Sequence, residues 1–292
     1  MPAASGLSII IPARDEAETI REILNQLHEI VPDAEVVVVD DGSHDATAQI
    51  AGECGARVIC HPYSKGNGAS VKSGLRAVTG TNVVIMDADG QHNPNDVPGL
   101  VAKLDRYDLV VGARDTNSET SFGRRLYHGA LNAFGTFISD RPVLDATSGF
   151  RAAKLELFAQ FIHLYPNGFS TPVTSTLAFI KAGYSVDFYP LTMYKRAGGQ
   201  SKIRPVADGL RFFIIVFRMI TLFAPMKVFL PTSFVFITLA LIYTALDVLF
   251  VSQRLHVANT AVLLFTMGVL VFLIGLVSEQ IAALRFERSG KE

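Results

Sequence analysis

The first two-thirds of the chain alternate short apolar runs with segments whose apolar residues recur at helical spacing. The runs predict strands over Leu7–Ile11, Glu35–Val39, Ala56–Cys60, Asn82–Met86 and Asp108–Val111. Helices are predicted after Ala17, from Asp45 through Cys54, and over Ser70–Val78 and Asn95–Arg106. Strands that are apolar throughout are typical of a sheet buried on both faces. The pattern therefore predicts an α/β domain with a mostly parallel sheet covered by helices.

The last third carries two long runs without a charged residue. Val228–Leu246 has 19 such positions and Val257–Ser278 has 22, with only a short linker around Ser252–His256 between them. At 1.5 Å per residue, each run can cross a hydrocarbon core of about 30 Å. We therefore predict a transmembrane hairpin with spans near 228–250 and 257–279. The alternative is a pair of core helices in a soluble protein.

Basic residues flank this predicted hairpin unevenly. The flanks carry Arg211, Arg218 and Lys227 before it and Arg285, Arg288 and Lys291 after it, and the linker carries Arg254 alone. The positive-inside rule then predicts a protein of the cytoplasmic (inner) membrane, with the α/β domain and both termini in the cytoplasm. No cleavable signal peptide is expected, because the apolar run 7–11 is too short for one.

A separate amphipathic helix is predicted between the domain and the hairpin. Arg204, Arg211 and Arg218 are spaced by seven and form one stripe, while most other positions are apolar. As a third span, this segment would place two arginines in hydrocarbon at about 2.5–3.5 kcal/mol each. An interfacial helix fits better, and a helix packed on the domain is the alternative. The predicted organisation is thus a domain over 1–203, an interfacial helix over 204–226 and the hairpin over 227–292.

Composition narrows the function classes. The net charge of −1 gives no support for nucleic-acid binding. Cys54 and Cys60, the two cysteines of the sequence, have neither the spacing of a zinc site nor that of a disulfide framework. Both are expected to be ordinary buried residues of a protein in a reducing compartment.

Polar clusters follow three of the predicted strands, at Pro12–Glu16, Asp40–Ser43 and Asp87–Gln91. Ligands of open α/β sheets bind at the carboxyl ends of the strands, where these clusters should meet. Asp87 and Asp89 would repel each other there unless a cation neutralised them, and such oxygen ligands suit Mg²⁺ or Mn²⁺ bridging to a diphosphate. Alone, Asp-x-Asp is common in solvated loops. A Gly-rich turn brings Lys65 within reach of a phosphate, although it lacks the Walker order.

A set of motifs makes the chain resemble a known family over residues 7 to 205. The motifs are "IPARDE", "VVVVDDGSHDAT", "MDADGQHNP", "VVGAR", "TSGFRA" and "GGQSKI". They resemble the family 2 glycosyltransferases of the GT-A fold, which is a Rossmann-like, mostly parallel α/β architecture. Within that family the chain looks like the polyisoprenyl-phosphate hexosyltransferases, the group of dolichyl-phosphate mannose synthase and the undecaprenyl-phosphate sugar transferases.

The resemblance implies a role for each matching residue. The nucleoside would be held by Pro12, Ala13, Glu16 and Asp41. The metal would be bound by Asp87, Asp89 and Gln91, with Asp87 also beside the nucleotide. The acceptor phosphate would be held by Arg114, Ser121 and either Arg124 or Arg125. The donor diphosphate would be covered by Arg196, Ser201 and Lys202, together with Lys65. Asp89, Arg114 and Arg125 would act directly on the reaction. Residues 147–151 would shape the acceptor and sugar pocket, although Arg151 could equally form a structural ion pair.

The expected reaction is metal-dependent transfer of a hexose, with inversion, from a nucleoside-diphosphate sugar to a polyprenyl phosphate at the membrane. The sugar and the base stay open, with UDP-glucose and GDP-mannose as examples, and a homo-oligomer is possible. One alternative is a processive polysaccharide synthase. Those enzymes carry a Gln-x-x-Arg-Trp motif, which a chain without tryptophan cannot contain. The other is a membrane-tethered sugar-nucleotide sensor, which would not need a complete metal site.

Overall fold

The computed structural model describes residues 6–115, 122–168, 170–194, 205–252 and 258–289. The chain forms two compact units, Met1–Asp208 and Gly209–Glu292. The predicted boundary between residues 203 and 204 falls in the segment 195–204, which lies outside the described residues. Each unit is considered by itself below.

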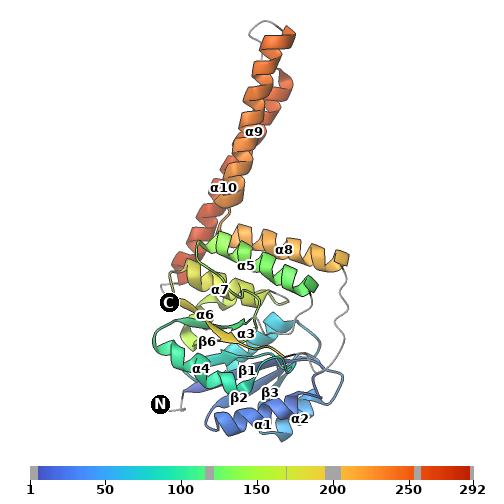
Figure 1. Ribbon diagram of the computed structural model, residues 1–292, viewed down its shortest axis with the longest axis vertical. Helices are drawn as coiled ribbons and strands as arrows, with labels where there is room; N and C mark the ends of the chain where they lie inside the picture. The colour runs from blue at the N-terminus through green and yellow to red at the C-terminus, as the bar shows by residue number, and fades with distance from the viewer. Residues whose placement is uncertain (1–5, 116–121, 169, 195–204, 253–257, 290–292) are drawn as a thin grey trace. The chain divides into compact units, whose positions relative to one another are not determined.

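The first unit is built on one seven-stranded sheet within the described residues (Figure 1). Its strands are β1 (Leu7–Ala13), β2 (Glu35–Asp40), β3 (Arg57–Cys60), β4 (Asn82–Ile85), β5 (Leu109–Arg114), β6 (Arg151–Lys154) and β7 (Val186–Leu191). Their order is β3-β2-β1-β4-β6-β5-β7. Only β6 runs antiparallel to its neighbours, so the predicted mostly parallel sheet is confirmed.

The five predicted strands appear as β1 to β5, whereas β6 and β7 were not predicted. The four residues of β6 have basic residues at both ends, and β7 contains Asp187 and Pro190. Neither segment has the continuous apolar run that identifies a buried strand. Pro190 is tolerated because β7 is the last strand in the order and lies at the edge of the sheet.

Helices cover the sheet on both faces, and the first four, α1 to α4, lie near the predicted positions (Figure 1). They are α1 (Ile20–Ile30), α2 (Thr47–Glu53), α3 (Asn67–Ala77), α4 (Val97–Ala102), α5 (Phe122–Ser139), α6 (Leu155–Phe161) and α7 (Thr171–Lys181). The predicted helix over 95–106 is shorter than expected, because 3₁₀ turns at Pro94–Asp96 and Lys103–Asp105 flank α4. Pro98 lies in the first turn of α4, where its missing N–H breaks no helical hydrogen bond.

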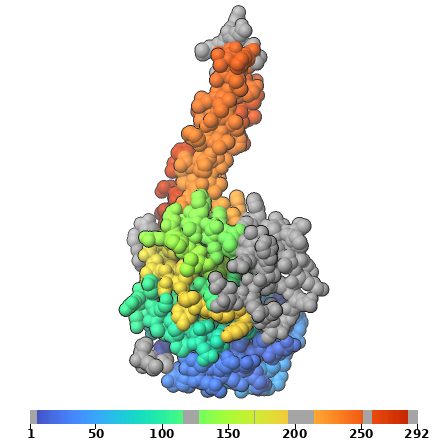
Figure 2. All heavy atoms as spheres, in the orientation of Figure 1, coloured from blue at the N-terminus to red at the C-terminus, as the bar shows by residue number. Residues whose placement is uncertain are grey.

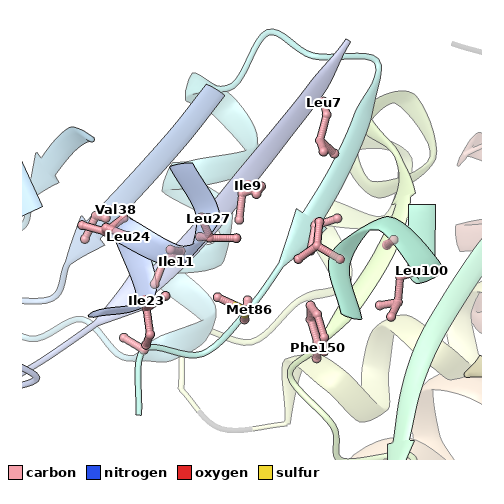
Figure 3. Packing of buried hydrophobic residues seen from close by; sticks show 14 of the residues in the cluster. Leu7, Ile9, Ile11, Ile23, Leu24, Leu27, Val38, Met86, Leu100 and Phe150 are labelled. Atoms are coloured by element: carbon pink, nitrogen blue, oxygen red, sulfur yellow. The ribbon is translucent and has the colours of Figure 1, made fainter. Parts of the chain in front are cut away.

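The core of this unit lies along β1. Every second residue of this strand points to the same face of the sheet. Leu7, Ile9 and Ile11 lie on that face, where they pack with α1 and with Met86 and Leu100 (Figure 3). Ile10 points to the other face, against α3, where a side chain on Gly74 would come within 2.4 Å of it. β1 is therefore buried on both faces, and this burial fixes the position from which the polar segment after Ala13 begins.

The second unit contains a helical hairpin. After α8 (Pro205–Phe223) come α9 (Met226–Leu246), a π-helical segment (Asp247–Ser252) and α10 (Asn259–Ser289). Small buried or closely packed residues recur every seven positions on α10, at Ala261, Gly268, Gly275 and Ala282, and the two glycines face α9. A Cβ on Gly268 would lie 2.7 Å from Ile237, and one on Gly275 would lie 2.5 Å from Phe229. Glycine thus permits a close approach of the two helices, as in membrane helix pairs.

The described helices of the hairpin, orange to red in Figure 2, expose many apolar side chains. The most apolar windows of α9 and α10 are only 11% and 17% buried, and Phe234, Leu241 and Leu263 are among the exposed side chains. A core helix of a soluble protein would bury most of such a surface. The alternative of core helices is therefore rejected, and both helices are long and apolar enough to cross a membrane.

The cysteine prediction was wrong for Cys60, which is exposed, while Cys54 is partly buried. Cys60 is the last residue of β3, at the free edge of the sheet, where no further strand covers it. The short apolar run did not reveal that the strand lies at an edge.

Candidate active site

The carboxyl ends of four strands meet at one edge of the sheet. β1 ends at Ala13, β2 at Asp40 and β4 just before Asp87, and these strands are mutually parallel. β5 has the same direction as β4, because each is antiparallel to β6, and it ends at Arg114. The topology therefore brings the predicted nucleoside, metal and acceptor segments to the same edge.

Asp41 is buried at this edge and organises the loop that follows β3. Its carboxylate accepts hydrogen bonds from His61 Nδ1 (2.8 Å), Ser64 Oγ (2.7 Å), and the amides of Lys65 and Gly66 (both 2.8 Å). Burial alone would raise the pKa of Asp41, but these four hydrogen bonds hold it below its usual value. They also occupy the four lone-pair sites of the carboxylate. A direct contact with a nucleoside would have to share one of them.

The turn after β1 is tied to the segment after β2. Asp15 has a φ of 55°, and its side chain accepts the amide of His44 at 2.7 Å. The amide of Glu16 donates to Thr47 Oγ1, and that of Ala17 donates to Asp45. The sequence also predicts Asp45 as the cap of this helix, but α2 begins at Thr47 with Ala46 at the N-cap, and Asp45 accepts the Thr47 amide from one residue further back. The two predicted nucleoside segments are therefore joined by several hydrogen bonds.

Asp87 is surrounded by three residues from separate elements. His92 Nε2 lies 3.7 Å from its carboxylate, and Asn67 Nδ2 approaches at 3.5 Å. Gly149 packs against it so closely that a Cβ there would lie 2.1 Å from Asp87 Oδ2. Burial would raise the pKa of Asp87, but the contact with His92 and the other neighbours keep it below its usual value. Asp87 is thus a carboxylate in a confined position.

Asp89 and Gln91 complete an oxygen donor set. Asp89 Oδ1 accepts the amide of Gln91, and the Gln91 side-chain nitrogen donates to the carbonyl of Tyr194, so Gln91 Oε1 can serve as an acceptor. No group of three or more His, Cys, Asp or Glu side chains able to hold a metal occurs among the described residues. Mg²⁺ needs fewer protein ligands, since it keeps waters and binds substrate phosphates. Two carboxylates and an amide oxygen therefore fit Mg²⁺ or Mn²⁺.

Arg114, at the end of β5, is held by the loop before β6. Its Nε lies 3.6 Å from the buried Asp145 carboxylate, and its Nη1 donates to Thr147 Oγ1 at 3.3 Å. Asp145 also accepts the amides of Thr147 and Ser148. Arg114 is a partly exposed cation with a preset orientation.

Several predicted residues cannot be compared with this geometry. Ser121, Arg196, Ser201 and Lys202 lie outside the described residues. Arg124 and Arg125 belong to the first turn of α5, but their side chains lie outside the described part. Pro12 and Ala13 are buried at the end of β1, Glu16 is partly buried, and Lys65 is exposed with its Nζ 5.8 Å from the Tyr63 ring. Their predicted roles stay predictions.

Sequence reasoning missed four residues of this site: His61, His92, Asp145 and Gly149. His92 and Gly149 lie inside motifs that had been singled out, so their neighbourhood was visible but not their contact with Asp87. His61 directly follows the predicted strand Ala56–Cys60 but belongs to none of the motifs, and Asp145 follows no predicted strand. Their partners are 20 and 31 residues away in the chain, and only the fold brings them together.

Two family profiles match the chain. Glycosyl transferase family 2 matches residues 8–162, and the GtrB C-terminal hairpin matches residues 224–284. The first match covers more than half of the chain. The chain therefore belongs to glycosyl transferase family 2, and it is a glycosyltransferase with a GT-A domain and a C-terminal hairpin.

Individual relatives refine this assignment. Polyprenol monophosphomannose synthase of Mycolicibacterium smegmatis is 31% identical over 213 residues, which are 67% of this chain and 80% of that protein. Undecaprenyl-phosphate mannosyltransferase of Micrococcus luteus is 28% identical over 210 residues, 66% of this chain and 86% of that protein. The family relatives are thus polyprenyl-phosphate sugar transferases.

A solved structure supports the fold. Glucosyl-3-phosphoglycerate synthase of Mycobacterium tuberculosis in complex with Mn²⁺ and UDP-glucose has a TM-score of 0.59 at 24% identity, covering 74% of this chain and 78% of that chain. The same enzyme in complex with Mg²⁺ and uridine diphosphate has a TM-score of 0.58. The expected Rossmann-like GT-A sheet is confirmed.

Proposed function

We propose that this glycosyltransferase transfers a hexose from a nucleoside-diphosphate sugar to a polyprenyl phosphate, with inversion, at the cytoplasmic face of a membrane. The proposal depends mainly on one observation: the carboxyl ends of β4 and β5 lie on the same side of the sheet, with Asp87 and Asp89 after β4 and Arg114 at the end of β5. The same chain carries two helices that are long and apolar enough to cross a membrane. The names of the relatives support the lipid phosphate acceptor, and the ligands of the solved structure support a nucleotide-sugar donor.

The donor would be held by the acidic side of the site. Asp87, Asp89 and Gln91 would bind Mg²⁺ or Mn²⁺, which neutralises the negative charge that develops on the leaving diphosphate. The nucleoside would lie against the turn after β1 and the segment after β2, which the hydrogen bonds of Asp15, Glu16 and Ala17 hold together. Lys65, Arg196, Ser201 and Lys202 are proposed to bind the diphosphate.

The acceptor needs positioning more than activation. A phosphate monoester has its second pKa near about 6, so at neutral pH it is mostly a dianion and needs no general base. Its oxygen attacks the anomeric carbon, the bond from that carbon to the diphosphate breaks, and the nucleoside diphosphate leaves with the bonding electrons. Arg114 and Arg125, with Ser121 and Arg124, are proposed to hold the acceptor phosphate. Arginine suits this task, because its planar fork binds phosphate oxygens in pairs.

A transfer assay tests the proposal. The full chain in detergent would be incubated with polyprenyl phosphate, Mg²⁺ or Mn²⁺, and radiolabelled UDP-glucose, UDP-N-acetylglucosamine or GDP-mannose in turn. We expect label in the lipid fraction with one donor, its loss with EDTA, and at least a tenfold lower rate for Asp89→Asn, equivalent to about 1.4 kcal/mol. If no donor labels the lipid, or if Asp89→Asn keeps more than about a tenth of the rate, the corresponding part of the proposal is wrong.

A further inference from the structure

Arg151 is a buried cation without a carboxylate partner. It lies at the start of β6 with 2% of its surface exposed, and no acidic group lies within ion-pair distance of it among the described residues. The sequence had allowed a structural ion pair, and the structure excludes one with any described residue. A buried charge normally requires a partner, so its retention calls for a reason.

The guanidinium instead joins two separate segments by hydrogen bonds to neutral groups. Its Nη2 donates to the carbonyl of Ser148, immediately before Gly149. Its Nη1 donates to the carbonyl of Pro172 at 2.8 Å and to the hydroxyl of Ser175, both in the first turns of α7. Arg151 therefore ties the Ser148–Gly149 segment to the start of α7.

That segment confines Asp87. The Cα of Gly149 is so close to the Asp87 carboxylate that a Cβ would lie 2.1 Å from Oδ2. Asp87, Gly149 and Arg151 also line one small cavity together with Tyr165. Two buried polar atoms, Arg151 Nε and Tyr165 Oη, have no hydrogen-bond partner within the described residues. Arg151 and Asp87 thus lie along the same small cavity.

We propose that Arg151 is a positioning residue of the proposed metal site, which holds Asp87 in its metal-binding geometry through the Ser148–Gly149 segment. The inference rests on the proposed function, because it requires a divalent cation at Asp87. The role depends on the planar fork, since Ser148 and the start of α7 must be contacted at the same time. A lysine has one ammonium group on a flexible stem and cannot reproduce both contacts.

The test measures metal binding rather than transfer. Free Mn²⁺ would be titrated by electron paramagnetic resonance against the full chain in detergent, with UDP in one series and GDP in another. We expect Arg151→Met and Arg151→Lys to bind Mn²⁺ at least tenfold more weakly than the wild type in the series where the wild type binds more tightly. Melting temperatures are expected to fall, because each substitution leaves at least one of the carbonyls of Ser148 and Pro172 without its hydrogen-bond donor, so Mn²⁺ is titrated well below the melting temperature of each variant.

Two further variants separate positioning from disturbance of the fold. Tyr165→Phe removes a polar atom from the same cavity and should leave Mn²⁺ affinity within twofold of the wild type. Ser175→Ala removes one acceptor of Arg151, keeps the charge, and should weaken Mn²⁺ binding by about two- to fivefold even if the Arg151 variants fail to fold.

The outcomes are distinct. Folded Arg151 variants with wild-type Mn²⁺ affinity would overturn the inference, as would a Tyr165→Phe loss equal to theirs. Unfolded Arg151 variants combined with wild-type affinity in Ser175→Ala would overturn it too. The metal role itself is tested separately: if the wild type and Asp89→Asn bind Mn²⁺ equally, the proposed function fails at the metal, whatever Arg151 does.

Discussion

Two buried aspartates near the carboxyl ends of the strands accept hydrogen bonds from the surrounding loops. Asp41 is saturated by the loop that carries Lys65, and Asp145 holds the loop before β6 and orients Arg114. Buried carboxylates persist only when hydrogen bonds or cations compensate for their lost hydration. Both side chains meet that condition with partners from distant parts of the chain. Asp87 and the partly exposed Arg114 are then among the described groups that are placed to face a substrate.

The residue-scale prediction concerns the acceptor phosphate. Arg114→Ala should raise the KM for polyprenyl phosphate at least tenfold and leave the KM for the donor nearly unchanged, because the dianion loses a fixed cation near an acidic site. Steady-state kinetics with each substrate varied would measure this, and Arg114→Lys should restore little of the loss. The exposed Arg141, on the loop that leads to Asp145, gives the control Arg141→Ala. Normal acceptor kinetics in Arg114→Ala would assign the phosphate to other residues.

Close packing defines the hairpin at the scale of elements. Ser233 Oγ donates to the carbonyl of Gly268 at 2.8 Å, and the side chain of Glu279 accepts the amide of Met226 at the start of α9. The glycines on α10 allow the backbones to approach, so van der Waals contact and these hydrogen bonds hold the pair together. In a bilayer such packing replaces the hydrophobic effect, which does not separate apolar side chains from apolar lipid.

We predict that Gly275→Leu destabilises the hairpin. Its Cβ would lie 2.5 Å from the Cβ of Phe229, and overpacking of this kind typically costs about 1–3 kcal/mol. Thermal unfolding in detergent should show a lower melting temperature for the variant. Leu273→Ala changes an exposed residue of the same helix and should leave the melting temperature close to that of the wild type. Equal melting temperatures for Gly275→Leu and the wild type would contradict the packing described here.

The whole molecule combines a catalytic unit with a hairpin that can cross a membrane. The proposed function, with a water-soluble nucleotide sugar and a lipid acceptor, would require the catalytic unit to work at the surface of a bilayer. The distribution of basic residues predicts that this surface is the cytoplasmic one. The α8 helix, which precedes the hairpin, is proposed to lie in the interface on the same side, as its arginine stripe suggests.

Cysteine labelling in intact cells tests this topology. A membrane-impermeant maleimide should label Arg254→Cys from outside, while Arg211→Cys should react only after the membrane is opened. The native Cys60 is exposed and belongs to the catalytic unit, so it serves as an internal control that should react only in opened cells. Labelling of position 211 but not of position 254 in intact cells would reverse the proposed orientation.

The sequence alone determined the strands β1 to β5, the helical hairpin and the polar segments at the strand ends. These features depend on local periodicity and on the length of apolar runs, which a linear pattern records directly. The family motifs added the expected chemistry of Asp87, Asp89 and Gln91. The sequence could not reveal β6, a short strand inserted between β4 and β5, or β7, an edge strand paired with β5, because both are defined by pairing rather than by a continuous apolar run of their own.

Only the tertiary structure decided which groups meet. The antiparallel insertion of β6 between β4 and β5 brings Gly149 against Asp87 and Arg151 beneath the strand ends, and it sets Asp145 beside Arg114. Contacts between residues far apart in the chain depend on strand order and register, which no local pattern encodes. For the same reason the exposure of Cys60 was mispredicted: whether a strand lies at the edge or in the middle of a sheet is a property of the assembled fold.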